Sequence, residues 1–432
     1  MGKKTGNSHR NYLLLIVTFI ISLSMVLSTE NIWIHINSML LLCLIAIFTV
    51  KVDILHPYCW FSSFFGLYSI GHPLLTAIGV PSGIEYSYKS ILYQLIALFI
   101  CLLIIGPYNY TKKINDNSLN YSQFQIKTSG KNRRIYYFLL IIISLAAIYV
   151  SKMGFSGKAE IYSSGGVIIN MIFRLPLVIS LFFTILLISD YTKKKQISKK
   201  IIYITLCALL LITLFSGERD FVFRFLIILL FNFLFLNKIS FRQLIVFVTI
   251  MIIIIPLSSM FKYYFVGGGI GESSEYGFLY SLIAGEFESA SRNLQLLINN
   301  ESFAKGCQGY VILINDVLGV INSKIASSVA WFNKTFYSDS VTEYGFSLVG
   351  EGYIIDGING IVIVFVIVGL IIRYIYIHAF KNIYWLTAYF YFITVMIYAI
   401  RGDLGTIYSA MLKQIFLVVM FLKLLNKKYT IK

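Results

Sequence analysis

The sequence predicts an all-α, polytopic integral membrane protein with about twelve transmembrane helices. Three observations carry this prediction. Hydrophobic residues make up 58% of the 432 residues. Only 13% of the residues are charged, whereas a soluble domain carries about 25%. The apolar residues also lie in runs long enough to cross a bilayer, so the composition and its pattern together exclude a soluble globular domain.

The apolar runs define the predicted spans. A bilayer core of roughly 30 Å requires about 20 apolar residues per helix, within a range of about 17–25. The first run follows Lys3, Lys4 and Arg10 and lacks a small-residue cleavage site, so we interpret it as an uncleaved helix. The seventh and eighth runs are separated only by 217–220, which predicts a tight hairpin. The runs fall near 12–28, 32–50, 57–79, 89–109, 135–151, 167–189, 200–216, 221–237, 242–262, 350–373, 382–400 and 405–425.

Lysine and arginine residues gather in alternate connections and indicate the orientation. Basic runs lie at 112–134, at 193–200 and at the C-terminal end, 423–432. Because cytoplasmic loops are enriched in Lys and Arg, we place these runs and both termini in the cytoplasm. The charge balance is then +20 inside and −3 outside, which gives the net charge of +17. The basic surplus therefore reflects topology and affinity for anionic lipid, and we expect no nucleic-acid partner.

One long connection interrupts the single transmembrane domain predicted for 1–432. It is a large outer loop at 263–349, between predicted spans 9 and 10. The stretches 277–300 and 309–332 place apolar residues at helical spacing. We therefore expect two or three helices lying on the outer face. A long loop in a compact protein is usually functional.

Cations at the outer ends of the spans predict an anion site. Arg174 and Lys413 lie about 10–12 Å inside their helices, where an unpartnered charge is costly unless a wet cavity receives it. We therefore predict a positively charged cavity that opens to the outside. Arginine binds phosphate through paired hydrogen bonds, so the cavity suits a diphosphate. The candidate diphosphate-binding residues are Arg174, Arg219, Arg224, Arg292, Arg401 and Lys413.

Some of these charges also have a structural interpretation. Asp220 and Arg224 are four residues apart, as are Glu288 and Arg292, and such pairs lie on the same helix face. Any single pair is explained as well by a surface ion pair as by a binding site. The set is harder to explain in this way, because five of its cations come from four different helices, all at the outer end; they are Arg174, Arg219, Arg224, Arg401 and Lys413.

Carboxylates at the same outer level supply candidate general bases. A carboxylate there could take the proton from a sugar hydroxyl, or it could hold an arginine in place. The candidate catalytic residues are Glu218, Glu351 and Asp403, while Asp220 and Asp356 are further acids at this level. His72, in the third predicted span, is another candidate base, although a lone histidine on an apolar helix more often has a structural role.

The sequence calls for no metal and no cofactor. Its five histidines are scattered, and its five cysteines have neither paired nor metal-ligand spacing. The glycine-rich run at 267–271 follows a membrane helix and not a strand, so we interpret it as a flexible exit and not as a phosphate loop. Aromatic residues of the outer loop suit a membrane interface, and they also suit stacking on sugars.

Three short segments resemble a known family. The segment 216–221 is similar to a motif of a small residue, Gly, any residue and Arg that opens a helix. The segment 350–361 is similar to an acid–x–Tyr motif that leads into a glycine-rich span, and Arg401-Gly402-Asp403 is similar to a basic-acidic turn before the last helix. With its predicted spans and large outer loop, the chain resembles the bacterial O-antigen and related polysaccharide repeat-unit polymerases (Wzy type). Many members have Asn-Phe-Gly where this chain has 355–357.

The resemblance implies a metal-independent glycosyltransferase of the bacterial inner membrane. Such an enzyme joins undecaprenyl-diphosphate-linked oligosaccharide repeat units at the outer leaflet. Its partners would be the lipid-linked donor and acceptor and membrane lipid, with a chain-length regulator protein as a further candidate. The cations would stabilise the departing diphosphate. Glu218, Asp403 or Glu351 would deprotonate the acceptor hydroxyl.

Two alternatives remain open at this point. An O-antigen ligase-like glycosyltransferase uses the same donor, and such enzymes often rely on a histidine in the large outer loop. The segment 262–349 contains no histidine, which favours the polymerase. A polysaccharide flippase or transporter should have charges through the middle of its spans and short loops on both sides. Here the buried charge is predicted at the outer ends, and one outer loop is long.

Overall fold

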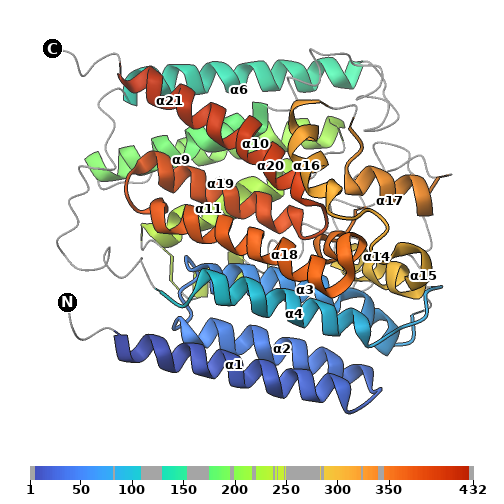
Figure 1. The fold of residues 1–432 in the computed structure, drawn as a ribbon. Coiled ribbons are helices and arrows are strands. Elements are labelled where there is room, and N and C mark those ends of the chain that lie inside the picture. Colours follow the sequence, from blue (N-terminus) through green and yellow to red (C-terminus); the bar gives the residue numbers. More distant parts are fainter. Residues whose placement is uncertain are drawn as a thin grey trace. The chain divides into compact units, whose positions relative to one another are not determined.

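The structure, a computed structural model, divides into two compact units. The first unit comprises Met1–Asp116, Phe278–Ile377 and Val395–Ala410, and the second comprises Asn117–Gly277, His378–Thr394 and Met411–Lys432. All regular secondary structure of the described residues is helical (Figure 1). The described residues are 5–80, 83–108, 129–152, 175–194, 199–216, 220–236, 239–240, 242–247, 249, 283, 287–322, 325–338 and 345–427.

The helices follow the predicted spans along the chain. The first unit contains α1 Thr5–Leu27, α2 Ile32–Thr49, α3 Pro57–Ala77, α4 Lys89–Ile105, α14 Glu288–Asn299, α15 Glu301–Ala304, α16 Val311–Ile321, α17 Ser328–Phe336, nearly all of α18 Leu348–Ala379 and α20 Leu404–Ser409. The second unit contains α6 Ser129–Lys152, α9 Leu175–Lys194, α10 Lys199–Ser216, α11 Asp220–Phe235, most of α19 Ile383–Ala399, most of the π-helix Ala410–Phe416 and α21 Leu417–Lys427.

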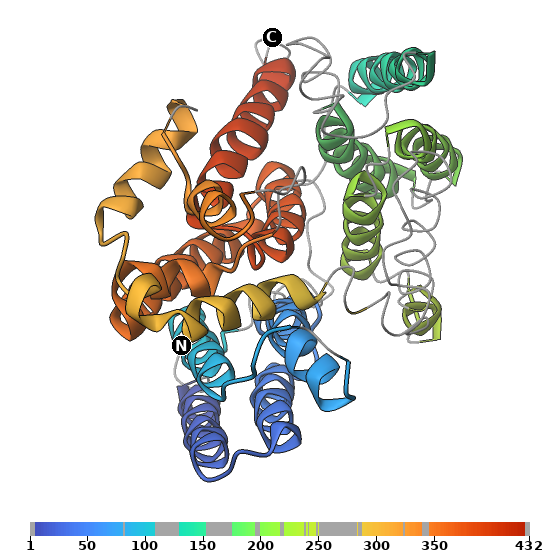
Figure 2. The same ribbon diagram turned by 90° about the vertical axis from the view of Figure 1, so that its right-hand side faces the viewer.

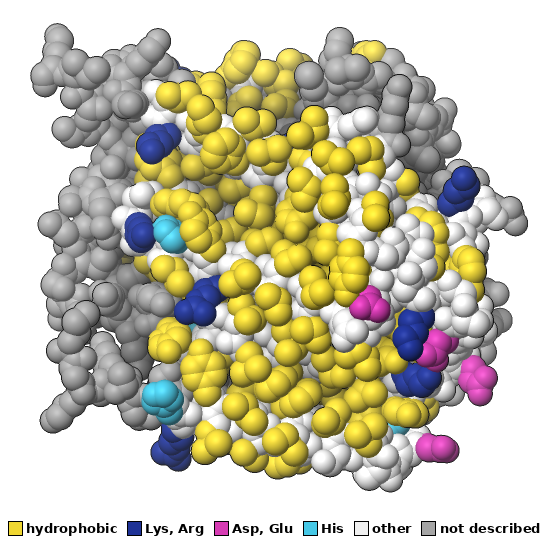
Figure 3. All heavy atoms as spheres, in the orientation of Figure 1, with side chains coloured by type: hydrophobic (Ala, Val, Ile, Leu, Met, Phe, Trp, Pro, Cys, Tyr) yellow, Lys and Arg dark blue, Asp and Glu magenta, His cyan; other side chains and the backbone are white. Residues whose placement is uncertain are grey.

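Four helices among the described residues are long and apolar enough to cross a membrane. They are His9–Leu27, Ile32–Thr49, Leu348–Ala379 and Leu404–Leu424. Hydrophobic side chains also cover most of the surface over α4 and α18 (Figure 3). These features indicate a multi-pass membrane protein, and the all-helical prediction is confirmed. A helix occupies every predicted span except the one near 242–262, most of which lies outside the described residues. The number of twelve spans stays a prediction.

The first unit has a helical layer at one end of its spans. Figure 2 shows α1 and α2 nearly end on, whereas α14 and α16 are seen from the side. Helix α14 crosses α3 at Gly71, where a Cβ atom would lie only 2.4 Å from the Phe287 carbonyl oxygen. The His72 amide donates to Ser291 Oγ at 2.9 Å and fixes this crossing. Helices α14, α16 and α17 thus confirm that the stretches 277–300 and 309–332 contain helices.

Helix α18 bends sharply near its start, which hydropathy alone does not reveal. Asp356 and Gly357 leave the helical conformation, and Gly357 has a φ of 56°, a value that favours glycine. A short helix at 348–355 therefore precedes the longer helix at 358–379. Its carbonyls of Tyr353 and Ile354 accept hydrogen bonds from the amides of Gly306 and Gln308, at 3.2 and 2.9 Å. The segment 306–308 thus supplies hydrogen-bond donors to the carbonyls at the end of this short helix.

Two glycines allow the bend. A Cβ atom at Gly352 would lie 2.5 Å from Ile361 Cα, and Gly360 is similarly close to the Gly352 carbonyl. We predict that Gly352→Ala lowers the free energy of unfolding by about 1–3 kcal/mol, because backbone and not a flexible side chain must move. The midpoint of thermal unfolding in detergent measures this. The control is Gly319→Ala, whose Cβ would find its nearest neighbour at 3.8 Å. Equal midpoints for the two variants would contradict the prediction.

The second unit is held by polar bonds and aromatic contacts between its helices. The Tyr136 hydroxyl hydrogen-bonds Thr205 between α6 and α10, and Asn232 of α11 donates to Thr184 of α9 at 3.2 Å. The Phe231 ring of α11 lies 6.0 Å from that of Phe390 of α19. Helix α10 ends at Ser216 and α11 begins at Asp220. These ends agree with the predicted hairpin, whose residues 217–219 lie outside the described residues.

Candidate functional site

Three buried carboxylates lie close together in the first unit. They are Asp316 of α16, Glu351 of the short helix that opens α18, and Asp403 immediately before α20. Their exposed fractions are 2%, 0% and 2%. Burying an ionisable group is costly unless it is paired or protonated. We call these three residues the carboxylate cluster. Each of them must have a hydrogen-bond partner or hold a proton.

Glu351 is held between the first turns of two helices. Its Oε1 accepts from Ser328 Oγ of α17 at 3.1 Å, and its Oε2 accepts from the Leu404 amide of α20 at 2.8 Å. The first amides of a helix lack partners within the helix and favour negative charge. The fold therefore places Glu351, one of the three predicted catalytic residues, where both carboxylate oxygens are bonded.

Asp403 has a capping role. Its Oδ1 accepts from the amide and the hydroxyl of Thr406, both at 2.7 Å, and caps α20. Its Oδ2 accepts from the Val329 amide in the first turn of α17 at 3.3 Å. The sequence predicts Asp403 as a candidate base, but both of its oxygens join helix N-termini. We therefore assign it to positioning α17 and α20 around Glu351.

This role predicts a specific loss of stability. Replacing Asp403 by alanine removes the cap and should lower the free energy of unfolding by about 1 kcal/mol or more. Asn is as good an N-cap as Asp, so Asp403→Asn should keep most of the stability. Unfolding in mixed micelles at increasing SDS fraction measures both variants. A loss of the same size in both would contradict the capping role.

Asp316 completes the cluster and was not among the predicted site residues. Among the described residues no N–H group and no hydroxyl group donates to either of its oxygens. Its carboxyl instead lies close enough to the Glu351 carboxyl for a hydrogen bond to join the two acids. Such a bond requires that one of the two acids holds a proton, as in other carboxyl pairs. The two acids therefore form a pair that shares a proton.

The local sequence permits this close approach. A Cβ atom at Gly405 would lie 3.3 Å from Asp316 Oδ1 and 3.5 Å from Asp403 Oδ1. Glycine at this position therefore leaves room for α16 against α20. Burial raises the pKa of Asp316 to about 6, and the charge of Asp403 acts in the same direction, against the hydrogen bond from Glu351. A carboxyl group with this pKa is well suited to accept a proton near neutral pH.

Two predicted cations lie in the same unit. The Arg401 guanidinium lies 4.7 Å from the centre of the Tyr398 ring, and Arg401 is two residues from Asp403. The Arg401 carbonyl accepts from the Phe346 amide at 2.8 Å. Next to Phe346, the Gly345 carbonyl accepts from Asn293, the neighbour of Arg292. The segments that carry Arg292 and Arg401 thus meet at Gly345.

Arg292 also belongs to a second polar cluster. Its Nε lies 3.8 Å from Glu288 Oε1, and the same oxygen lies 3.6 Å from His72 Nδ1. His72 is fully buried, and among the described residues neither of its ring nitrogens has a hydrogen-bond partner. The predicted pair of Glu288 and Arg292 is therefore present, and it continues to His72.

The other predicted site residues belong to the second unit or lie outside the described residues. Arg224 belongs to the second unit and bonds Asp220 at 2.8 Å. Lys413 lies in the part of the π-helix that belongs to the second unit. Arg174, Glu218 and Arg219 lie outside the described residues. The convergence of all six cations on one diphosphate therefore stays a prediction.

Asp356 has a structural partner. Its Oδ2 accepts from the Tyr310 hydroxyl at 2.7 Å, at the bend of α18.

Within the part of the chain that the structure describes, no group of three or more His, Cys, Asp or Glu side chains could hold a metal ion.

One signal could have found Asp316. It is the only charged residue in the apolar stretch 310–322. An isolated acid in an apolar helix of a membrane protein is a functional candidate by default. The charged turns between spans are a stronger signal in the sequence, and the spacing of apolar residues over 309–332 predicts only an amphipathic stretch.

Comparison with known proteins adds no identification. No protein-family model matches the chain, and no significant match was found among curated proteins or solved structures.

Proposed function

We propose that the chain is a membrane glycosyltransferase that joins lipid-diphosphate-linked oligosaccharide repeat units at the outer leaflet of the bacterial inner membrane. The observation that carries the proposal is the proton-sharing pair of Asp316 and Glu351 beside the Arg401-Gly402-Asp403 turn. A proton acceptor and a cation are the two groups that this reaction requires. Two of the three segments that resemble the repeat-unit polymerases contain Glu351 and this turn; they are 350–361 and 401–403.

The proposed reaction is a displacement at the anomeric carbon of the donor. The acceptor hydroxyl gives its proton to the carboxyl pair, and its oxygen forms the new bond to that carbon. The bond from the same carbon to the diphosphate oxygen breaks, and the diphosphate leaves with the electron pair. Arg401 and Arg292 stabilise the charge on the leaving group. Since the carboxyl pair is buried, α16 or α17 must move to admit the substrate.

The reaction rate should depend on pH in a defined direction. Below the pKa of about 6, Asp316 takes up a proton in addition to the one that the pair already shares. The pair can then no longer act as a base. The rate should therefore fall as the pH decreases below about 6 and level off above it. Polymer formation by the purified protein in proteoliposomes, measured between about pH 5 and 8, tests this. A rate that is constant over this range would contradict the role of the pair.

A proton-coupled transporter of lipid-linked saccharides is the second candidate. Buried acids that share a proton also form the proton relays of pumps and transporters. The polymerase proposal predicts covalent products from two lipid-linked units, and the transporter proposal predicts movement of unchanged units across the membrane.

Deletion of the gene followed by analysis of surface glycans separates the candidates. A single repeat attached to the lipid acceptor of the cell surface would indicate loss of a polymerase. Lipid-linked polymer that never reaches that acceptor would indicate loss of a ligase-like enzyme. Repeat units that remain on the cytoplasmic side would indicate loss of a transporter, and this result would overturn the proposal.

A further inference from the structure

Helix α16 exposes an apolar face that a helix in water would bury. Its acid, Asp316, is buried together with Ile312 and Val320, while most of its other large apolar side chains are exposed. A surface helix in water buries its apolar face and exposes its polar one. The exposed side chains form one stripe at helical spacing, the apolar stripe. They are Tyr310 at 48%, Val311 at 64%, Ile314 at 61%, Val317 at 51%, Leu318 at 45% and Ile321 at 82%.

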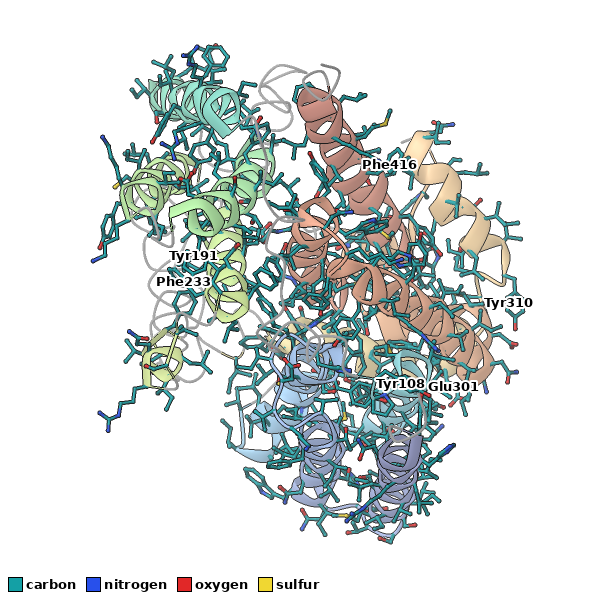
Figure 4. The ribbon with its side chains drawn as sticks, turned by 90° about the vertical axis from the view of Figure 1, so that its left-hand side faces the viewer. Tyr108, Tyr191, Phe233, Glu301, Tyr310 and Phe416 are labelled. Atoms are coloured by element: carbon teal, nitrogen blue, oxygen red, sulfur yellow. The ribbon has the colours of Figure 1, made fainter. Side chains whose placement is uncertain are left out.

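The surroundings of α16 place it at the end of a membrane span. The helix packs against α20, which is the first part of the candidate span Leu404–Leu424. At its other end, the Tyr310 hydroxyl bonds Asp356 at the bend of α18. Figure 2 shows α16 from the side while α1 and α2 are nearly end on, so α16 runs across the direction of these spans. Figure 4 shows Tyr310 at the outer edge of the unit.

We propose that the apolar stripe of α16 lies against the acyl chains of the membrane, with the helix axis close to the membrane plane. The segment 310–322 contains no charged residue except the buried Asp316. Aromatic side chains on α15 and α17 are of the kind that is enriched at the membrane–water interface. Among them the Phe303 ring stacks on the Trp331 ring with 6.4 Å between centroids.

The size of the stripe argues against a protein as its occupant. A helix of 11 residues is about 16 Å long and about 10 Å wide. The apolar stripe has six side chains, whereas a stable protein interface involves about 20–30 residues on each partner. Lipid requires no minimum contact area. The bilayer that surrounds the adjoining candidate span Leu404–Leu424 also covers the apolar stripe.

This placement has a consequence for the carboxylate cluster. Helix α16 presents hydrocarbon-facing side chains on one face and Asp316 on the other, so a single helix separates the cluster from the lipid. A lipid-anchored molecule would thus reach the cluster from the plane of the membrane by displacement of α16. The placement itself does not depend on the proposed chemistry and can fail or hold separately.

Spin labels on single cysteines test the placement directly. The five native cysteines are first replaced by serine or alanine, and labels are attached at Ile314, Ile321 or the control position Thr335, an exposed polar residue of α17. The full-length protein is reconstituted in phosphatidylglycerol–phosphatidylethanolamine vesicles. Collision rates with oxygen, which concentrates in lipid, are compared with those for a water-soluble nickel chelate. A monodisperse elution profile in detergent establishes that each labelled protein is folded.

The expected result is that oxygen exceeds the nickel chelate at 314 and 321, and that the order is reversed at 335. A higher accessibility to nickel at 314 and 321 would place α16 in water and overturn the proposal. Dipolar broadening between labels at 314 on two copies would show that a second copy covers the stripe. That result would also overturn it.

Discussion

Polymer formation should be lost when Asp316 is replaced by asparagine. The substitution keeps the size of the side chain and a hydrogen bond to Glu351, but it removes one of the two acids that share the proton. Removing a general base usually lowers the rate by about 10²–10⁴-fold. A glycan ladder on a gel should therefore collapse to lipid-linked single repeats, with an unchanged level of protein in the membrane.

A second acid of the same region serves as the control. Asp356 bonds Tyr310 and lies outside the proton-sharing pair, so Asp356→Asn should keep the ladder. If Asp316→Asn also produced a normal ladder, the pair would have no part in the chemistry. If both variants lost the ladder together with the membrane-bound protein, Asp316 would have a structural role only.

The second large effect concerns the leaving diphosphate. Arg401→Ala removes a cation two residues before Asp403 of the carboxylate cluster, and the loss of one such stabilising group costs about 10²–10³-fold in rate. Lipid-linked single repeats should accumulate, and the ladder should disappear. We expect the same result for Arg219→Ala, on the basis of the sequence alone. The readout is the gel of surface and lipid-linked glycans, with membrane protein measured in parallel.

The loss of the ladder in Arg401→Ala should depend on the position and the type of the cation, and not only on the loss of one positive charge. Lys381 is an exposed cation between α18 and α19, on the side of the membrane predicted to be cytoplasmic, and Lys381→Ala should keep the ladder. Arg401→Lys should restore only part of the activity, because lysine does not form the paired hydrogen bonds of arginine. Normal ladders in both Arg401→Ala and Arg219→Ala would remove the diphosphate-binding role from these residues.

Hydropathy and helical spacing were sufficient to predict most of the helices. The spans near 32–50 and 382–400 match α2 and α19 closely, because long apolar runs have few alternatives in a membrane. The N-cap of α20 can also be inferred from the sequence, since Asp403 comes directly before a helical run. Glu351 was predicted because it lies at the predicted outer end of a span, at the level of the predicted cations, where a carboxylate could act as a general base.

The bend of α18 and the position of Asp316 could not be derived in this way. The bend depends on a positive φ at Gly357 and on the contact of Gly352 with Gly360. Neither changes the hydropathy of an apolar run. Asp316 is separated from Glu351 and Asp403 along the chain, and only the packing of α16 against α20 brings the three acids together. Such contacts depend on tertiary structure, which local patterns do not encode.

We propose that this chain forms glycosidic bonds between lipid-linked units with the help of Asp316 and Glu351. The most direct measurement uses the purified chain in proteoliposomes that contain only lipid-diphosphate-linked oligosaccharide, and it determines the length of the lipid-linked products by mass spectrometry. We expect products of two or more repeats together with released lipid diphosphate for the natural sequence, and single repeats for Asp316→Asn. Unchanged single repeats with the natural sequence, or equal elongation by the variant, would contradict the proposal.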